Sequence, residues 1–196
     1  MRDGARPLVL ASSSPRRREL LRAAGFTFEI SEPNLDERAL PGESAIAQAR
    51  RLALEKARAV AARYPRTACV LAADTIVVLD DDVLGKPRDA DEAVEMLLRI
   101  QGRDHRVLTG FALVVRELDI EDHAVIESAV RMHNVDRATA RAYADSGEPL
   151  DKAGAYAAQG EGGRFVAEIR GSRTNVIGLP MEAVVARLAH AGVEPT

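Results

Sequence analysis

A long apolar run with one carboxylate inside it, ACVLAADTIVVL (residues 68–79), limits what this chain can fold into more than any other stretch. A run of this kind is typical of a strand that is buried within a sheet. Asp80, Asp81 and Asp82 follow it and predict a turn, after which the residues up to Pro87 predict a short return. A strand of this length and polarity needs helices to cover its sheet.

Helix and strand patterns alternate along the rest of the chain. The predicted strands span residues 7–11, 26–31, 105–117, 124–135 and 164–170. The predicted helices span residues 15–24, 45–64, 91–100, 137–145 and 180–191. The strands 105–117 and 124–135 are expected to form an antiparallel pair. Together these patterns predict an α/β fold with a mixed, twisted sheet flanked by helices, and no repeat or linker divides residues 1–196 into separate domains.

Composition narrows the class of protein. With 196 residues, of which 46% are hydrophobic, the chain can bury a substantial core. The formal net charge of −3 gives no general attraction for nucleic acid or for anionic membranes. No signal peptide or membrane-spanning run is evident, so a cytoplasmic protein is expected. The single cysteine, Cys69, lies in the apolar run and is interpreted as a packing residue.

The stretch LASSSPRRRELLRAAG (residues 10–25) concentrates hydroxyls and positive charge at one helix start. Ser14 is a good N-cap residue and Pro15 suits the first helical position. Arg16, Arg17 and Arg18 would then occupy the first turn, where each cation is unfavourable by about 0.3–1 kcal/mol. A bound anion would reverse that cost, since backbone N–H groups and guanidinium groups could hold the same phosphate oxygens. A solvated basic face with Ser14 as an ordinary cap remains the alternative.

Two charged residues contradict their apolar surroundings. Asp74 lies within the buried strand, where a carboxylate requires a cation, a metal ion or hydrogen-bond donors beside it. It is a candidate metal ligand or general base, with a structural ion pair as the alternative. Lys56 shares its helix stripe with Ala49, Leu52 and Ala53. Its side chain either extends along the apolar surface to water or binds phosphate in a cleft.

Three further candidates lie in loops: Glu37 in NLDER, Lys86 in LGKP and Gln159 in AQGEGG. Glycine lets backbone approach a ligand closely, and lysine is a compact partner for phosphate. The chain contains no GxxxxGK[ST] loop, no zinc-like spacing of cysteine and histidine, and no GxSxG motif. Basic groups, hydroxyls and two carboxylates together predict a phosphate site that is served by a divalent metal ion.

Several motifs resemble, in this order along the chain, those of the Maf family of nucleoside triphosphate pyrophosphatases. They are LASSSPRRRELL, LDE, ALEKA, AADTIVVLDDDVLGKP, TGFAL, GEPLDKAGAYAAQG and GLPM. The match covers nearly the whole chain, from Leu8 to Met181. The resemblance implies an elongated, two-lobed α/β fold with a central cleft. It also implies a hydrolase, dependent on Mg²⁺ or Mn²⁺, that converts a nucleoside triphosphate to the monophosphate and pyrophosphate. Such enzymes are thought to remove surplus or non-standard nucleotides, with a link to arrest of cell division.

The resemblance also implies roles for individual residues. Asp74 corresponds to the proton acceptor, and Asp74 and Glu37 would hold the metal ion. The residues that would bind the substrate are Ser12, Ser14, Arg16, Arg17, Glu37, Lys56 and Lys86.

Three positions separate subgroups of the family. The subgroup that acts on dTTP and UTP has arginine, threonine and glutamine there, and this chain has Arg16, Thr75 and Gln159. The subgroup that acts on 7-methyl-GTP has tryptophan, glutamine and glutamate. The chain departs from the family pattern with AYAAQG in place of AYGIQG, next to Gln159.

The expected partner is a small-molecule nucleoside triphosphate, with no nucleic-acid or membrane partner. Whether the chain forms a homodimer is left open. One alternative is a nucleotide-binding regulator of cell division without turnover, although simple binding would not need a candidate base among the cations. Another is a pyrophosphatase for 7-methyl-GTP. A single-stranded nucleic-acid binder is disfavoured, because 4% aromatic residues and no tryptophan offer few stacking platforms.

Overall fold

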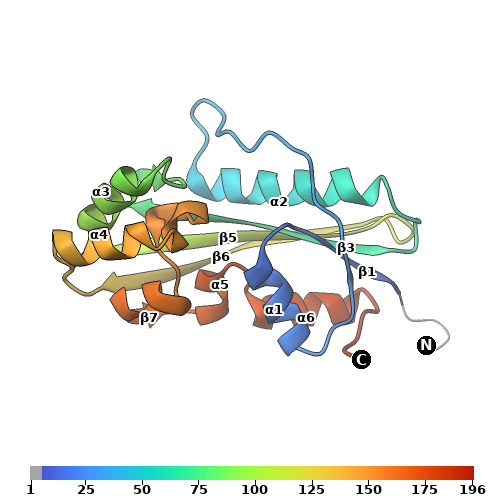
Figure 1. The fold of residues 1–196 in the computed structure, drawn as a ribbon. Coiled ribbons are helices and arrows are strands. Elements are labelled where there is room, and N and C mark those ends of the chain that lie inside the picture. Colours follow the sequence, from blue (N-terminus) through green and yellow to red (C-terminus); the bar gives the residue numbers. More distant parts are fainter. Residues whose placement is uncertain (1–5) are drawn as a thin grey trace. The chain divides into compact units, whose positions relative to one another are not determined.

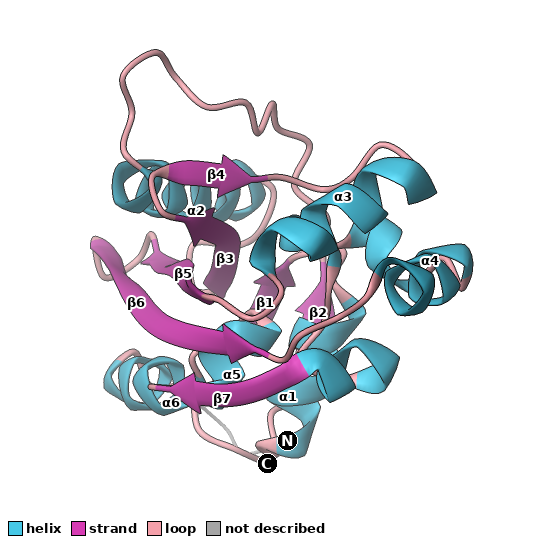
Figure 2. Ribbon diagram, turned by 90° about the vertical axis from the view of Figure 1, so that its left-hand side faces the viewer, coloured by secondary structure: helices cyan, strands magenta, loops and turns pink. Residues whose placement is uncertain are grey.

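The computed structural model describes residues 6–196 and contains seven strands and six α-helices (Figures 1 and 2). The strands are β1 (Leu8–Ala11), β2 (Glu29–Ile30), β3 (Cys69–Leu79), β4 (Asp82–Leu84), β5 (Asp104–Val115), β6 (Ile120–Met132) and β7 (Val166–Arg170). The α-helices are α1 (Pro15–Ala23), α2 (Ala45–Ala61), α3 (Ala90–Ile100), α4 (Arg137–Asp145), α5 (Arg173–Ile177) and α6 (Met181–His190). No helix among residues 6–196 combines the length and the apolar character needed to cross a bilayer.

All seven strands belong to one mixed sheet, in the order β2-β1-β3-β5-β6-β7, with β4 paired to β3. β1 runs parallel to β2 and β3, whereas the β3–β4 and β6–β7 pairs are antiparallel. Only residues 116–119 connect β5 to its neighbour β6, which is too short for a parallel crossover, so these strands form a hairpin. The prediction of an α/β fold with a mixed sheet flanked by helices is confirmed.

The chain divides into two compact units, which are described separately below. The first unit comprises the residues up to Asp74 together with Thr109–Ile126 and Gly178–Thr196. The second unit comprises Thr75–Leu108 and Glu127–Ile177. The single domain over residues 1–196 and the central cleft that the sequence suggested remain predictions.

The core of the first unit follows from strict alternation along β1 and β3. One set of side chains packs against α2: Val9, Ala11, Val70 and Ala72 meet Ala53, Ala57 and Val60. The intervening side chains meet α1 and α6: Leu8, Leu10, Leu71 and Ala73 pack with Leu21, Val184 and Leu188. Because neighbouring residues of a strand point to opposite faces, a central strand covered on both sides must be apolar at nearly every position.

Cys69 belongs to this core. Its side chain is fully buried, and burial raises the pKa of the thiol to about 12. A thiol with that pKa stays protonated at neutral pH and is a poor nucleophile. The interpretation of Cys69 as a packing residue is therefore confirmed.

Gly110 in β5 allows α2 to approach the sheet closely. A Cβ atom at this position would lie 2.2 Å from the Ala49 carbonyl oxygen and 2.5 Å from its carbon. No side chain fits at those distances, so only glycine lets the α2 backbone lie so near the strand. Since α2 carries Lys56, Gly110 contributes to the position of a predicted site residue.

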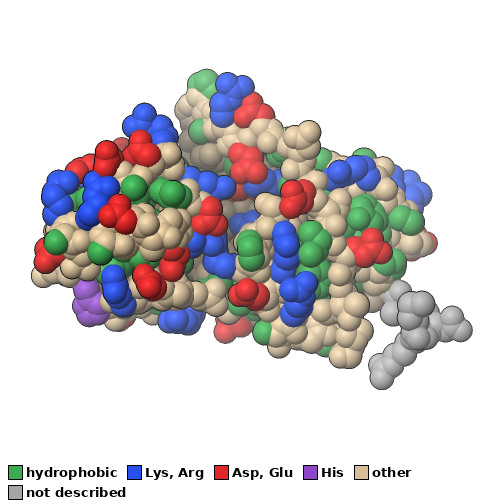
Figure 3. Space-filling model, in the orientation of Figure 1, with side chains coloured by type: hydrophobic (Ala, Val, Ile, Leu, Met, Phe, Trp, Pro, Cys, Tyr) green, Lys and Arg blue, Asp and Glu red, His purple; other side chains and the backbone are tan. Residues whose placement is uncertain are grey.

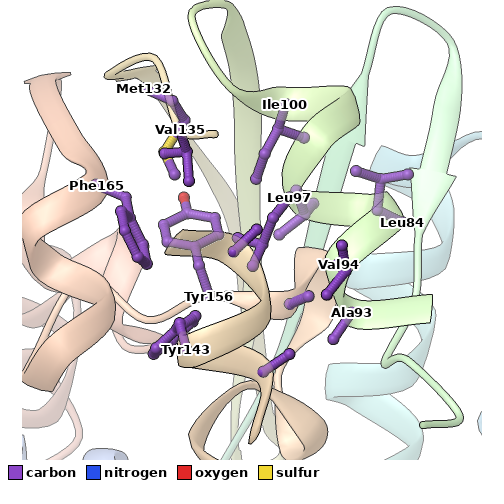
Figure 4. Packing of buried hydrophobic residues seen from close by; sticks show 14 of the residues in the cluster. Leu84, Ala93, Val94, Leu97, Ile100, Met132, Val135, Tyr143, Tyr156 and Phe165 are labelled. Atoms are coloured by element: carbon purple, nitrogen blue, oxygen red, sulfur yellow. The ribbon is translucent and has the colours of Figure 1, made fainter. Parts of the chain in front are cut away.

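The core of the second unit is formed where α3 and α4 pack on strands of the sheet. Figure 4 shows Leu97 of α3 beside the ring of Tyr156, and Val94 and Ile100 of α3 and Tyr143 of α4 belong to the same cluster. His105 of β5 lies beside this cluster, and its Nε2 is 2.7 Å from the Tyr156 hydroxyl oxygen. The hydrogen bond ties the segment that carries Tyr156 to the sheet.

The structure differs from the sequence-based expectations mainly in irregular segments. The strand predicted over 26–31 is reduced to Glu29–Ile30, and the helix predicted over 45–64 ends at Ala61. The glycine-containing loop forms three 3₁₀ segments, Glu148–Asp151, Ala153–Ala155 and Gly160–Phe165, and the last of these delays the start of β7. These 3₁₀ turns and the short helix α5 have no apolar periodicity long enough to predict them.

On the face shown in Figure 3, acidic side chains lie beside lysine and arginine side chains. Exposed ion pairs of the molecule include Arg58 with Glu121 at 2.5 Å and Arg99 with Asp82 at 2.6 Å. Exposed pairs of this kind typically contribute less than about 1 kcal/mol each. The packed cores therefore dominate the stability of the fold.

Replacing Gly110 by alanine is expected to lower the free energy of unfolding by about 1–3 kcal/mol, because the added methyl group collides with the backbone of α2. Urea unfolding measures the change. The control is Gly85→Ala, where nothing lies within 4 Å of the added atom. That variant is expected to stay within about 0.5 kcal/mol of the parent. Equal stabilities of the two variants would contradict the close approach of α2.

The stability of the fold is also expected to fall as the pH is lowered from 6.5 to 4, because of His105. Burial lowers the pKa of His105 from 6.5 to about 4, with the neighbouring Asp104 acting in the opposite direction. Between these values the unfolded chain binds a proton at His105 that the folded chain does not, so the free energy of unfolding decreases. The full shift corresponds to about 3 kcal/mol.

Urea unfolding of the parent and of His105→Gln, between pH 7 and pH 4, measures this effect. Carboxylates contribute the same pH dependence to both proteins, so the difference between their slopes belongs to His105. The variant is expected to lose less stability than the parent over this window. Identical slopes would show that the imidazole is not buried in its neutral form.

Candidate functional site

The hydroxyl-rich stretch lies where β1 ends and α1 begins. Ser14 occupies the N-cap position of α1 and Pro15 the first turn, as predicted, but the Ser14 side chain makes no capping hydrogen bond. The Ser14 backbone N–H instead donates to the hydroxyl of buried Ser12, over 3.1 Å. The first turn of α1 contains no acidic residue. The N-terminus of α1 thus combines backbone N–H groups with basic side chains and has no acidic residue of its own to balance them.

Arg17 reaches from α1 towards the last segment of the first unit. Its Nε donates to the Gly178 carbonyl oxygen over 2.7 Å, and one terminal nitrogen donates to the Ser12 hydroxyl over 3.2 Å. Burial lowers the pKa of Arg17, Asp74 and Glu37 oppose that shift, and Arg16 adds to it. Arginine still keeps its charge at neutral pH. A partly desolvated cation therefore lies within the electrostatic field of both predicted carboxylates.

Lys56 and Asp74 form a buried ion pair between α2 and β3. Lys56 Nζ lies 2.7 Å from Asp74 Oδ1, and the two side chains are only 6% and 11% exposed. Asp74 is two residues beyond Ala72, which puts it on the face of β3 that α2 covers. Lys56 is three residues beyond Ala53, which puts it on the matching stripe of α2. Alternation in the strand and periodicity in the helix therefore bring these two charges together.

Glu37 approaches the same ammonium from the loop between β2 and α2. Its Oε1 lies 2.9 Å from Lys56 Nζ, although the Glu37 side chain is 52% exposed. The loop is anchored by Arg51 of α2, which donates to both carboxylate oxygens of Glu43 over 2.7 Å and to the Arg38 carbonyl oxygen over 3.2 Å. Hydrogen bonds from Arg51 lower the pKa of Glu43. Sequence reasoning missed Arg51, and its only signal was an acidic partner four residues later, Glu55.

The structure decides between some of the alternatives that the sequence left open for Lys56 and Asp74. Lys56 does not extend to water, because its ammonium is buried between two carboxylates. Asp74 has the ion pair that a buried carboxylate requires, which does not exclude a chemical role as well. Both residues thus stabilise the fold and also lie within the candidate site.

The two carboxylates are of the type that binds magnesium. Asp74 Oδ1 and Glu37 Oε1 both contact Lys56 Nζ, so carboxylates from two segments lie together, and a metal ion would bind through their other oxygens. Mg²⁺ is usually held by one or two carboxylates, with water and substrate phosphates completing the octahedron. Within residues 6–196 no group of three or more acidic, histidine or cysteine side chains could hold a metal ion on its own. A metal ion here would take part of its ligands from the protein and the rest from water and the substrate phosphates.

The remaining predicted residues belong to the second unit or to its boundary. Thr75 follows Asp74 directly in β3 and is half-buried. Lys86 is exposed in the loop that follows β4, and half-buried Gln159 directly precedes the 3₁₀ segment Gly160–Phe165. The first unit thus brings together Ser12, Ser14, Arg17, Glu37, Lys56 and Asp74, with Arg16 half-buried on α1 beside them. The structure does not join Lys86 and Gln159 to that cluster.

The chain was compared with known proteins. A family model described as "Maf-like protein" matches residues 7–191, which include most of both units. A dTTP/UTP pyrophosphatase of Myxococcus xanthus (strain DK1622) is 52% identical over 186 residues, 95% of this chain and 93% of that protein. Two others of the same description, from Desulfotalea psychrophila and Symbiobacterium thermophilum, are 46% and 49% identical, with at least 94% of each chain covered.

Replacing Lys56 by methionine is expected to lower the free energy of unfolding by about 3–5 kcal/mol, because it leaves Asp74 buried without its cation. Urea unfolding at pH 7 measures the loss. The double variant Lys56→Met/Asp74→Asn removes the uncompensated charge and is expected to recover part of the stability.

The matched control is Arg58→Met on the same helix, which removes only an exposed ion pair with Glu121. Its stability is expected to stay within about 1 kcal/mol of the parent. If Lys56→Met proved as stable as this control, the pair would contribute little to the fold.

Proposed function

The chain belongs to the Maf-like protein family, and from this membership we propose that it hydrolyses dTTP and UTP to the monophosphate and pyrophosphate. The observation that carries the proposal is the meeting of Asp74 and Glu37 at the ammonium of Lys56, with Arg17 in the same field. Paired carboxylates among cations suit metal-assisted attack on a phosphate better than they suit simple binding of an anion. We further propose that the enzyme acts on nucleotide pools in the cytoplasm.

In the proposed reaction a water molecule attacks the α-phosphorus of the nucleotide. The water proton passes to the Asp74 carboxylate, and the bond from the α-phosphorus to the bridging oxygen breaks as pyrophosphate leaves. Asp74 is suited to this role because Lys56 holds one of its oxygens at 2.7 Å and so orients the carboxylate. Asp74 and Glu37 would hold Mg²⁺ or Mn²⁺, which when bound lowers the pKa of a water molecule and offsets phosphate charge.

The basic and hydroxyl groups would receive the triphosphate. Ser12 and Ser14 would orient phosphate oxygens at the N-terminus of α1, where backbone N–H groups favour anions. Arg16 and Arg17 would stabilise the negative charge that develops on the leaving pyrophosphate. Lys56 has three N–H donors, and contacts with two carboxylates leave a third for a phosphate oxygen. Lys86 would be a further phosphate ligand.

Selection of the base would depend on Arg16, Thr75 and Gln159. These residues match the dTTP/UTP subgroup, and the relatives described above carry the same substrate pair in their names. A site with hydrogen-bonding groups for one base discriminates strongly against a base that leaves those groups unpaired. We therefore propose pyrimidine nucleotides, canonical or modified, as the substrate class.

A panel of nucleoside triphosphates tests the proposal. The chain is incubated with dTTP, UTP, CTP, dGTP, ATP and 7-methyl-GTP in the presence of Mg²⁺ or Mn²⁺, and the first phosphate product is identified. Pyrophosphate from dTTP and UTP is the expected result. Orthophosphate as the first product would exclude cleavage between the α- and β-phosphates, and binding without any product would favour the regulator.

Asp74→Asn is expected to lower kcat for dTTP by about 10²–10⁴-fold, because it removes the general base while keeping the size of the side chain. Steady-state kinetics with pyrophosphate detection measure the loss. Circular dichroism and nucleotide binding are expected to be preserved, because Glu37 still lies against the Lys56 ammonium at 2.9 Å. The control is Asp81→Asn, the same change at an exposed aspartate, which is expected to keep the parent rate. Parent-like turnover by Asp74→Asn would remove Asp74 from the mechanism.

A further inference from the structure

One partly buried hydrogen-bond cluster in the second unit has no role in the proposed chemistry. The carboxylate of Glu148 accepts three hydrogen bonds: from the Tyr143 hydroxyl over 2.9 Å, from the Gly162 N–H over 3.1 Å and from the Glu161 N–H over 3.2 Å. Two of the donors are consecutive backbone groups at the start of the 3₁₀ segment Gly160–Phe165. Glu148 therefore binds the backbone immediately after Gln159.

The glycines of this loop explain how the backbone comes so close to Glu148. Gly160 has a φ of +70°, and a Cβ atom there would lie 3.1 Å from each Glu148 carboxylate oxygen. A Cβ atom at Gly162 would lie 2.4 Å from the Tyr143 hydroxyl oxygen and 2.8 Å from the Ala157 nitrogen. The glycine-rich loop thus approaches an anion that belongs to the chain itself.

The electrostatics of this contact favour an ionised carboxylate. Burial alone would raise the pKa of Glu148, but hydrogen bonds from Gly162, Tyr143 and Glu161, together with the nearby Lys152, lower it overall. Successive N–H groups of a turn form a concave site for an anion. In this loop that site is filled by Glu148, so it is not available to a phosphate group.

Gln159 lies between this contact and a second fixed point. On its N-terminal side, the Tyr156 hydroxyl is 2.7 Å from His105 Nε2, and on its C-terminal side Glu148 holds Glu161 and Gly162. The adjacent Ala158 carbonyl oxygen also accepts a hydrogen bond from Arg173 over 3.1 Å. Because the chain is fixed on both sides of Gln159, this residue loses little conformational entropy when a ligand binds.

We propose that Glu148 is a positioning residue, which holds Gln159 in the orientation that selects a pyrimidine base. The inference rests on the proposed function, since it assigns Gln159 to base selection. It adds that the selectivity of Gln159 depends on a carboxylate that does not touch the nucleotide. The only sequence signal for Glu148 is its place in GEPLDKAG, which precedes the glycine-rich loop.

Glu148→Gln is the informative substitution. It preserves the size of the side chain but replaces one acceptor oxygen by an NH₂ group, which then faces a backbone N–H donor. The loop is expected to lose its fixed position, so that Gln159 binds pyrimidines less selectively. The ratio of kcat/KM for dTTP to kcat/KM for dGTP is expected to fall at least about tenfold.

Four proteins are compared: the parent, Glu148→Gln, Gln159→Ala and the double variant. Glu148→Gln and Gln159→Ala are expected to lower the dTTP/dGTP ratio by similar factors, and the double variant is expected to lower it no further, because both act through one residue. The control is Glu168→Gln, the same change at an exposed position of β7 in the same unit, which is expected to keep the parent ratio. Thermal unfolding of each protein accompanies the kinetics.

A purely structural role for Glu148 would lower stability and reduce turnover of both nucleotides equally, and that result would overturn the proposal. Additive effects in the double variant would overturn it as well. Amide hydrogen exchange at Glu161 and Gly162 gives a readout that needs no substrate, and faster exchange is expected only where residue 148 is changed. If the parent released no pyrophosphate from any triphosphate, the proposed function would fail and the base-selection role would fail with it. Unchanged exchange in Glu148→Gln would refute the contact itself.

Discussion

The fold of the first unit depends on the ion pair between Lys56 and Asp74. Two charges lie within an interface between helix and sheet that is otherwise apolar. The Lys56 ammonium, 2.7 Å away, offsets the cost of burying Asp74, and Asp74 and Glu37 together offset the cost of burying Lys56. The pair therefore fixes the rotation of α2 about its axis and its position along β3. Gly110 reinforces this by letting the helix backbone lie close to β5. A slip of α2 by one residue would bury an ammonium against aliphatic side chains.

The same constraint connects stability with chemistry. The Lys56 ammonium, which neutralises Asp74, also contacts Glu37. The loop that follows β2 is therefore attached to α2 through a lysine that the buried Asp74 already requires. Arg51 anchors that loop at a second point through Glu43. The charged groups of this site also determine how helix and sheet pack. For this reason a charged residue within an apolar strand or helix stripe indicates such a site in the sequence.

The sequence predicted the charged centre more completely than the irregular segments. Asp74 within an apolar strand and Lys56 on an apolar helix stripe are each unusual, which singled out both residues, but that they pair with each other became evident only from the structure. Glu37, Lys86 and Gln159 lie in loops without periodicity, so residue type and neighbouring glycines made them candidates, and the family resemblance added their roles. The 3₁₀ turns after Glu148 depend on long-range hydrogen bonds to Glu161 and Gly162, which no local pattern encodes. The Ser14 side chain makes no capping hydrogen bond to α1, and the Ser14 N–H donates to the Ser12 hydroxyl; neither could be predicted from the preference of serine for the N-cap position.

The glycine-rich loop and the start of α1 both present backbone N–H groups that could hold an anion, and they differ in the groups that the chain supplies there. At the glycine-rich loop the N–H groups of Glu161 and Gly162 are bound by the carboxylate of Glu148. At the start of α1 the first turn has no acidic residue, the Ser14 hydroxyl makes no cap, and Arg17 lies alongside. An incoming phosphate would have to displace a carboxylate at the first place but would complement existing charge at the second. The glycines in QGEGG are therefore better explained by internal order than by phosphate binding, and the basic helix start is the better candidate for the triphosphate.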